Sequence, residues 1–531
     1  MSGIENNHNF PLKEDRGYIE IMDTTLRDGE QTSGVSFVPH EKLLIVRMLL
    51  QELCVDRVEV ASARVSEGEK EAVTMICRWA RQAGKLEQIE VLGFIDGKTS
   101  VDWVKAVGCK NINLLCKGSE RHCKYQLQKT LEEHVADIKQ SIQYAHEQGI
   151  EVNLYLEDWS NGMKDNPQYV FGFVDALRSA GVKRFMLPDT LGILNPMLTA
   201  QFISQMVERY PDLHFDFHAH NDYDMAAGNV LAAVLNGCKG VHTSVNGLGE
   251  RAGNAPLSSV QAILKDHFHG RTGLVEENLN KASRMVESIS GIAVPPNKPI
   301  IGESVFTQVA GVHADGDKKH SLYCNDLIPE RFGRKREYAL GKNSGKANIL
   351  KNLEELGLEL TPEQTRRVTD RIIELGDKKQ LVTQEDLPYI VSDVLKHTAP
   401  DDKVKLKSYM VSTAYGLKPM ASVKLQVGNE VYEDSAMGDG MYDAFVRACR
   451  HIYRDRLNRE FPWLDNYQVS IPPGGRTDAL VQTTISWVWN DKTFRTRALD
   501  PDQTEAAIKA TIKMLNIIEL EYEAEDCSTG R

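Results

Sequence analysis

Eight short apolar segments, separated by segments of a different periodicity, constrain the fold of this chain more than any other feature of its sequence. Each is rich in Val, Ile, Leu or Phe and has the length of a buried strand; they cover residues 18–25, 57–62, 89–94, 111–116, 151–158, 184–190, 214–221 and 240–247. Most of the segments between them carry helical periodicity, as at 40–53, 130–149 and 167–181, and the last two end in glycine, as helices commonly do. Eight such units within about 250 residues predict a (β/α)8 barrel.

An open, doubly wound sheet is the alternative arrangement of alternating strands and helices. Its usual Gly-rich first turn is absent, because the first strand leads into LRDGEQTSG. Polar residues also fall where a barrel places its active site, at the carboxyl ends of the strands. They are Arg27 and Asp28 after the first strand, Glu157 at the fifth, Asp189 and Thr190 at the sixth, and His218 and His220 at the seventh.

The chain is too long for one hydrophobic core and changes character twice after the predicted barrel. Residues 1–275 hold the barrel, and residues 276–400 are helical and loop-rich, which predicts linker subdomains that contribute to the active site. The run HTAPDDK (397–403) indicates a linker. Residues 401–531 contain four segments that alternate like strands and two helical segments, which predicts a small α+β domain.

Composition narrows the class of partner. A net charge of −12 argues against nucleic acid, since phosphate binding needs concentrated positive charge. The chain contains no run of 18 apolar residues, so we expect no membrane-spanning helix. The segment MSGIENNHNFPLKEDRG is polar, so we expect no secretion signal there. Nine scattered cysteines without a CxxC pair fit reduced thiols. We therefore expect a cytoplasmic protein with a small-molecule substrate.

The stretch HFDFHAHND (214–222) predicts a metal site. Side chains of a strand alternate between faces, so His218 and His220 point to the same side. Alone, such a pair could also be buried histidines that bond to neighbouring groups. Asp28 is the natural third ligand, because strands one and seven flank strand eight in a closed barrel, and Asn254 could supply or position a further oxygen. Three ligands with open positions suit a catalytic divalent ion such as Mn²⁺, Zn²⁺ or Mg²⁺.

Four motifs, DTTLRDGEQ, HAHNDYDMAAGN, VNGLGERAGN and GVHADG, resemble the signatures of the Claisen-condensing acyltransferases. This family comprises the 2-isopropylmalate, citramalate and homocitrate synthases, which join acetyl-CoA to a 2-oxo acid. The resemblance covers nearly the whole chain, because the segment from GDGMYDAFVRA to GGRTDALVQTTISW is similar to the family's allosteric regulatory domain. It implies acetyl-CoA as co-substrate, a homodimer, and a branched-chain amino acid as effector.

The resemblance also implies roles for individual residues. Arg27 would stabilise the developing alkoxide, and Thr190 would bond the substrate carboxylate. Glu157 and His313 would remove the acetyl-CoA proton and activate water, in an order that the sequence leaves open, with His313 coming from the other subunit. A barrel-rim salt bridge for Arg27, an orienting role for Glu157 and an ordinary loop histidine at 313 are the structural alternatives. The acetyl-CoA side would be lined by Asp315 and Tyr323.

The choice of 2-oxo acid depends on the pocket wall. Leu92, Leu115 and Tyr155, at the inner ends of strands three to five, predict a narrow apolar pocket for a methyl group. A second substrate carboxylate would demand a dedicated cation, which disfavours homocitrate synthesis. We therefore predict citramalate synthesis from pyruvate, in isoleucine biosynthesis; 2-isopropylmalate synthesis from 2-oxoisovalerate, under leucine control, is the alternative.

Two other classes of function are less consistent with these motifs. Lyases that cleave a hydroxymethylglutaryl thioester resemble this barrel but carry a catalytic cysteine in the loop that here reads NGLGERAGNAPL. A non-enzymatic amino-acid sensor would need no intact set of Asp28, His218 and His220. We therefore expect an enzyme.

Overall fold

Eight parallel strands close into a barrel in the order in which they occur along the chain. Each strand pairs with the next, and β8 pairs with β1. The strands are β1 (Glu20–Asp23), β2 (Arg57–Ser62), β3 (Ile89–Phe94), β4 (Asn111–Lys117), β5 (Glu151–Glu157), β6 (Arg184–Asp189), β7 (Phe215–Ala219) and β8 (Gly240–Thr243). This computed structural model confirms the predicted (β/α)8 barrel and excludes the open sheet.

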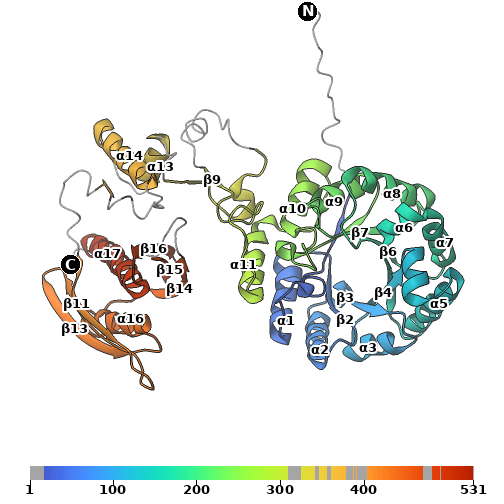
Figure 1. Cartoon of the computed structure of the whole chain (residues 1–531), viewed down its shortest axis with the longest axis horizontal. Coiled ribbons are helices and arrows are strands. Elements are labelled where there is room, and N and C mark those ends of the chain that lie inside the picture. Colours follow the sequence, from blue (N-terminus) through green and yellow to red (C-terminus); the bar gives the residue numbers. More distant parts are fainter. Residues whose placement is uncertain are drawn as a thin grey trace, which may run out of the picture. The chain divides into compact units, whose positions relative to one another are not determined.

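Helices follow every strand and surround the barrel (Figure 1). Polar caps set several helix starts: Thr130 accepts from the Glu133 amide, and Asn195 accepts from the Leu198 amide before a proline in the first turn. The main helices are α1 (Pro39–Arg47), α2 (Glu67–Gln82), α3 (Thr99–Val107), α5 (Leu131–Glu147), α6 (Trp159–Asp165), α7 (Pro167–Leu177), α8 (Pro196–Arg209), α9 (Ala226–Leu235) and α10 (Leu257–Ile263). Their buried faces and the outward faces of the strands form one continuous apolar core.

Three predicted elements end earlier than expected. The segment 240–247 leaves the sheet after Thr243, because the Ser244 amide bonds to the Ala255 carbonyl and Asn246 adopts a left-handed φ of 61°. Strand seven stops at Ala219, so His220 lies just beyond it. The helix predicted at 40–53 changes after Arg47 into one π-helical turn. Because β8 and β7 end early, loops continue the chain at the carboxyl ends of these two strands.

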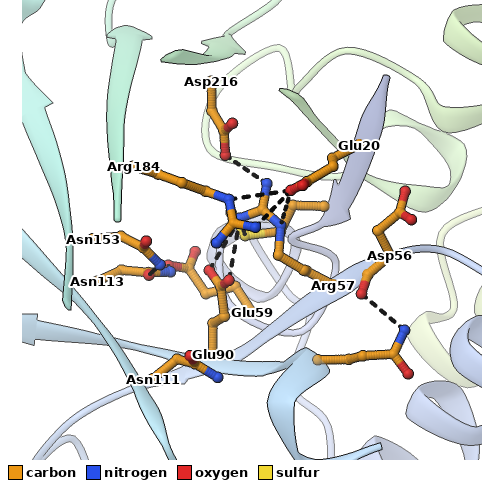
Figure 2. A network of polar contacts seen from close by, with 12 residues as sticks. Glu20, Asp56, Arg57, Glu59, Glu90, Asn111, Asn113, Asn153, Arg184 and Asp216 are labelled. Atoms are coloured by element: carbon orange, nitrogen blue, oxygen red, sulfur yellow. Dashed lines mark hydrogen bonds and ion pairs between the residues drawn. The ribbon is translucent and has the colours of Figure 1, made fainter. Parts of the chain in front are cut away.

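The inside of the barrel is polar at the amino-terminal ends of the strands. Arg57 contacts Asp216, Glu90 and Glu20 with N–O distances of 2.6, 3.1 and 3.2 Å, and Arg184 contacts Glu20 at 2.7 Å (Figure 2). Above this ionic layer lies a small apolar cluster of Met22, Leu92, Tyr155 and Met186, with Leu115 packed against it. The amino-terminal end of the interior is therefore filled by an ionic layer that an apolar cluster covers.

The structure describes residues 17–308, 325–340, 346–355, 360–377, 387, 390–391, 403–470, 481–490 and 492–529, which form two compact units. The first unit contains the barrel, α11 (Leu279–Ser290) and the short helix η8 (Pro329–Phe332). The second contains β9 (Thr307–Gln308), β10 (Glu337–Tyr338), α13 (Lys346–Glu355), α14 (Pro362–Asp377) and the carboxy-terminal elements.

The carboxy-terminal elements repeat one pattern of three antiparallel strands and a helix. The first copy comprises β11 (Val404–Ser412), β12 (Met420–Val427), β13 (Glu430–Met437) and α16 (Met441–His451); the second comprises β14 (Trp463–Ser470), β15 (Val481–Trp489), β16 (Lys492–Asp500) and α17 (Gln503–Thr529). Both copies share one apolar core. Among the described residues, no helix is long and apolar enough to cross a membrane.

Candidate active site

Asp28, His218 and His220 come together at the carboxyl ends of β1 and β7. The two Nε2 atoms lie 3.4 Å apart, and Asp28 Oδ2 lies 3.5 Å from His218 Nε2 and 4.0 Å from His220 Nε2. All three side chains are buried. The pairing of both β1 and β7 with β8 brings these distant parts of the chain together, as the sequence predicted.

The donor set fits a divalent cation. Two ligands each about 2.1 Å from one ion lie about 3 to 3.5 Å apart, which is close to the observed separations. Burial lowers the pKa of both imidazoles, that of His220 to about 4, so both are neutral and able to act as ligands at pH 7. Burial alone would raise the pKa of Asp28, but Arg27 and His218 outweigh it and hold that pKa well below its usual range. Asp28 Oδ1 and both Nδ1 atoms are buried without a hydrogen-bond partner in the structure.

Asn254 lies beside this cluster in the glycine-rich loop after β8. It forms a β-bridge with His220, and its Oδ1 is buried without a hydrogen-bond partner in the structure, while its Nδ2 donates to the Leu248 carbonyl. Gly253, at φ +85°, allows the loop to pass close: a Cβ there would lie 1.9 Å from the Gly247 oxygen. The tight loop thus leaves one amide oxygen available at the edge of the metal site.

Arg27 is held at three points. Its Nε, Nη1 and Nη2 lie 2.5 Å from Glu59 Oε2, 2.6 Å from Asp28 Oδ2 and 3.3 Å from the Tyr155 hydroxyl. The guanidinium therefore lies next to the candidate metal ligands in a fixed orientation, as an electrostatic stabiliser requires.

Lys42 anchors the loop that carries Arg27 and Asp28, and the sequence analysis did not single it out. Its fully buried ammonium donates to the Leu26 carbonyl and pairs with Glu30 and Glu69 at 2.7 and 2.6 Å. Lys42 directly precedes the apolar run at residues 43–46, and its carboxylate partners lie in two other segments, so no local pattern marked it.

Glu157 forms an ion pair with Lys117, its register partner on β4. Both residues lie on the inward face, two positions after Tyr155 and Leu115 respectively, at the open end of the barrel. Lys117 was also missed, although its position two residues beyond Leu115 follows from strand alternation. Thr190, at the end of β6, accepts a hydrogen bond from the Asp158 amide at 2.9 Å, which leaves its hydroxyl proton free for another acceptor.

The predicted wall residues Leu92, Leu115 and Tyr155 gather in one cluster, together with Met22 and Met186. The two methionines were not predicted, but they occupy inward positions of β1 and β6. The predicted catalytic residue His313, and Asp315 and Tyr323, which were predicted to line the acetyl-CoA side, lie outside the described residues.

Comparison with known proteins gives three matches that together span nearly the whole chain. Residues 18–286 match the HMGL-like family, residues 300–380 the homocitrate synthase post-HMGL domain-like family, and residues 381–519 the LeuA allosteric (dimerisation) domain. The (R)-citramalate synthase of Methanocaldococcus jannaschii is 33% identical over 504 residues, which are 94% of this chain and 99% of that protein. The chain belongs to the family of citramalate and 2-isopropylmalate synthases.

A relative of the other kind of synthase is equally similar to this chain. The 2-isopropylmalate synthase of the same organism is 34% identical over 518 residues, 96% of each chain. The solved structure of an HMG-CoA lyase from Brucella melitensis is 20% identical and covers 52% of this chain and 99% of its own, with a TM-score of 0.42. This chain is therefore an acyltransferase of the acetyl-CoA-dependent condensing type, and the two kinds of synthase are equally similar to it.

Proposed function

We propose that this enzyme is an (R)-citramalate synthase, which condenses acetyl-CoA with pyruvate and water to citramalate and CoA. The observation that carries the proposal is the inward cluster of Leu92, Tyr155, Met22 and Met186, with Leu115 beside it. These apolar side chains pack together inside the barrel, and Tyr155 contacts the candidate ligand His218, which supports an acceptor with a small apolar side chain such as the methyl group of pyruvate. Among the described residues, Arg27 and Lys117 at the carboxyl ends of the strands are already paired with carboxylates, which disfavours an acceptor with a second carboxylate.

The cation site comprises Asp28, His218 and His220, with Asn254 at its edge. A bound divalent cation would supply Lewis-acid polarisation of the acceptor keto group. Arg27 would stabilise the negative charge that develops on the keto oxygen, because its guanidinium is held beside Asp28. Thr190 would donate a hydrogen bond from its hydroxyl to the pyruvate carboxylate.

Glu157 and His313 are the two candidates for proton transfer. One of them takes a methyl proton from acetyl-CoA, and the resulting carbanion forms a bond to the keto carbon of pyruvate. The keto oxygen becomes an alkoxide and then takes up a proton. The other activates a water molecule that cleaves the thioester C–S bond, and CoA leaves as the thiol. Asp315 and Tyr323 would line the acetyl-CoA side.

The carboxy-terminal unit is the proposed site of feedback inhibition. We propose a homodimer in which His313 completes the site of the partner subunit, and in which residues 401–531 bind isoleucine and shift the enzyme toward a less active state. The match of residues 381–519 to the LeuA allosteric (dimerisation) domain supports this assignment. If isoleucine inhibited a chain truncated after residue 400 as strongly as the full chain, this assignment would be wrong.

The second candidate is 2-isopropylmalate synthesis from 2-oxoisovalerate, with leucine as effector. It stands beside the first because a 2-isopropylmalate synthase is as similar to this chain, at 34% identity over 96% of it, as the citramalate synthases are.

A CoA-release assay with acetyl-CoA and Mn²⁺ separates the two functions. We expect kcat/KM for pyruvate to exceed that for 2-oxoisovalerate at least tenfold. Even one additional methylene in an apolar pocket changes kcat/KM by about 10- to 200-fold. The reverse preference would assign the enzyme to 2-isopropylmalate synthesis. Absence of CoA release with either acid would refute both.

A further inference from the structure

Two buried side chains hold the hydroxyl of Tyr155. Its oxygen lies 2.9 Å from His242 Nδ1 and 3.3 Å from Arg27 Nη2. On its other side, His242 Nε2 lies 3.1 Å from Asp216 Oδ2. Tyr155, His242 and Asp216 are at most 2% exposed. A continuous row of contacts thus joins the pocket wall to the ionic layer at the amino-terminal end of the barrel, where Figure 2 shows Asp216 bound to Arg57.

Chemistry assigns the direction of each hydrogen bond in this row. A guanidinium only donates, so the Tyr155 oxygen accepts from Arg27. The Asp216 carboxylate pairs with the Arg57 guanidinium at 2.6 Å and only accepts, so His242 Nε2, at 3.1 Å, donates to it. With its proton on Nε2, the imidazole accepts the hydrogen bond of the Tyr155 hydroxyl at Nδ1.

This arrangement has a consequence for the pocket. The Tyr155 proton is directed at His242 and is not available to a substrate. The ring itself meets His218 edge-on, with centroids 6.0 Å apart, and packs with Leu92 and Met186. Because the ring lies between a candidate metal ligand and the apolar wall, any rotation of it would change the space left for the acceptor side chain.

The backbone is adapted to this row of contacts. Gly240, the first residue of β8, faces Asp216, and a Cβ there would lie 2.1 Å from Asp216 Oδ1. Only glycine leaves the carboxylate where it can bind His242 and Arg57 together. Asp216 Oδ1 also accepts from His214 Nε2 at 2.9 Å, so both oxygens of the carboxylate are engaged.

We propose that His242, which Asp216 orients, determines the acceptor specificity of this enzyme by fixing the Tyr155 ring as the wall of the substrate pocket. The inference rests on the proposed condensation with a 2-oxo acid and extends it. Neither residue touches the substrate; both are positioning residues that act through Tyr155. With the ring fixed, the pocket takes 2-oxo acids whose side chain is no larger than methyl, and with the ring released it takes longer ones.

Two substitutions at the same position separate this role from a general structural one. In His242→Asn the amide oxygen takes the place of Nδ1 and still accepts from Tyr155. In His242→Gln the amide reaches the place of Nε2 and still bonds Asp216, but Tyr155 loses its acceptor. The measurement is kcat/KM for 2-oxobutanoate, which is one methylene longer, relative to pyruvate.

We expect this ratio to rise at least about tenfold in His242→Gln and to stay within about threefold of the parent value in His242→Asn. An unchanged ratio in His242→Gln, or an equal rise in both variants, would overturn the inference. His214→Asn is the matched control, because the shorter amide does not reach the place of Nε2; it removes another Asp216 contact without touching Tyr155, and its ratio should equal that of the parent enzyme.

Tyr155→Phe tests the same hydrogen bond if the His242 variants do not fold, as judged by thermal unfolding. Removal of the hydroxyl should raise the ratio as in His242→Gln, and a parent-like ratio would overturn the inference. Failure of the proposed function is distinguishable, since the parent enzyme itself would then release no CoA from acetyl-CoA with any 2-oxo acid.

Discussion

Replacement of Arg57 by methionine tests whether the ionic layer stabilises the barrel. The guanidinium contacts two carboxylates that are almost fully buried, Asp216 at 2.6 Å and Glu90 at 3.1 Å. Methionine fills a similar volume but leaves both carboxylates without their cation. Removal of one partner from a buried ion pair costs about 3 to 5 kcal/mol, so we expect the free energy of unfolding of the barrel to fall by about that amount at pH 8.

The pH dependence gives the sharper test. In the parent enzyme the pKa of Asp216 lies well below its unfolded value of about 3.9, so its contribution to stability is present above that value and is lost as pH falls through the folded pKa. Without Arg57, burial would raise the folded pKa of Asp216 above the unfolded value. The carboxylate would then destabilise the folded state at neutral pH, and this penalty would be relieved as pH falls, by at most about 1.4 kcal/mol per pH unit.

Urea unfolding at pH 8 and pH 5 is monitored by hydrogen exchange of barrel peptides. This readout distinguishes unfolding of the barrel from unfolding of the carboxy-terminal unit. The difference between variant and parent should be smaller at pH 5. Arg178→Met is the control, because Arg178 pairs with Asp212 at the surface and its loss should leave the free energy of unfolding nearly unchanged. A loss below about 1 kcal/mol for Arg57→Met, or one that does not depend on pH, would refute the reasoning.

Three further predictions concern the active site. His218→Ala should abolish CoA release and lower the content of tightly bound metal, as measured by elemental analysis, and full activity of the parent enzyme in chelator would contradict the metal site. Lys117→Met should lower kcat by about 10- to 100-fold with little change in the KM for pyruvate, because Glu157 loses the cation that orients it; steady-state kinetics in which only KM rises would instead assign Lys117 to substrate binding. Gly253→Ala should weaken metal affinity in a competition titration, because a Cβ 1.9 Å from the Gly247 oxygen forces the Asn254 loop to move, and unchanged affinity would show that the loop does not support the site.

Much of the fold could be predicted from local patterns. The eight apolar segments, the helical periodicity between them and the absence of a Gly-rich first turn were sufficient for the barrel, because strand alternation and helix capping are properties of neighbouring residues. The same alternation placed His218 and His220 on one side and brought Leu92, Leu115 and Tyr155 to the interior. Closure of the barrel then required β1 to lie near β7, which predicted Asp28 as their companion.

Other features depended on contacts between distant segments. Lys42 has no local signature, since a lysine in a helix is usually exposed. Strand alternation could place Lys117 on the inward face but could not pair it, because the partners Glu69 and Glu157 lie on other elements. The early end of β8 depends on the bond between Ser244 and Ala255, which competes with the sheet. The row from Asp216 through His242 to Tyr155 joins side chains of three strands, β7, β8 and β5. The sequence by itself therefore determined which residues face inward, and only the tertiary structure decided which of them meet, because register between strands sets distances that no single segment encodes.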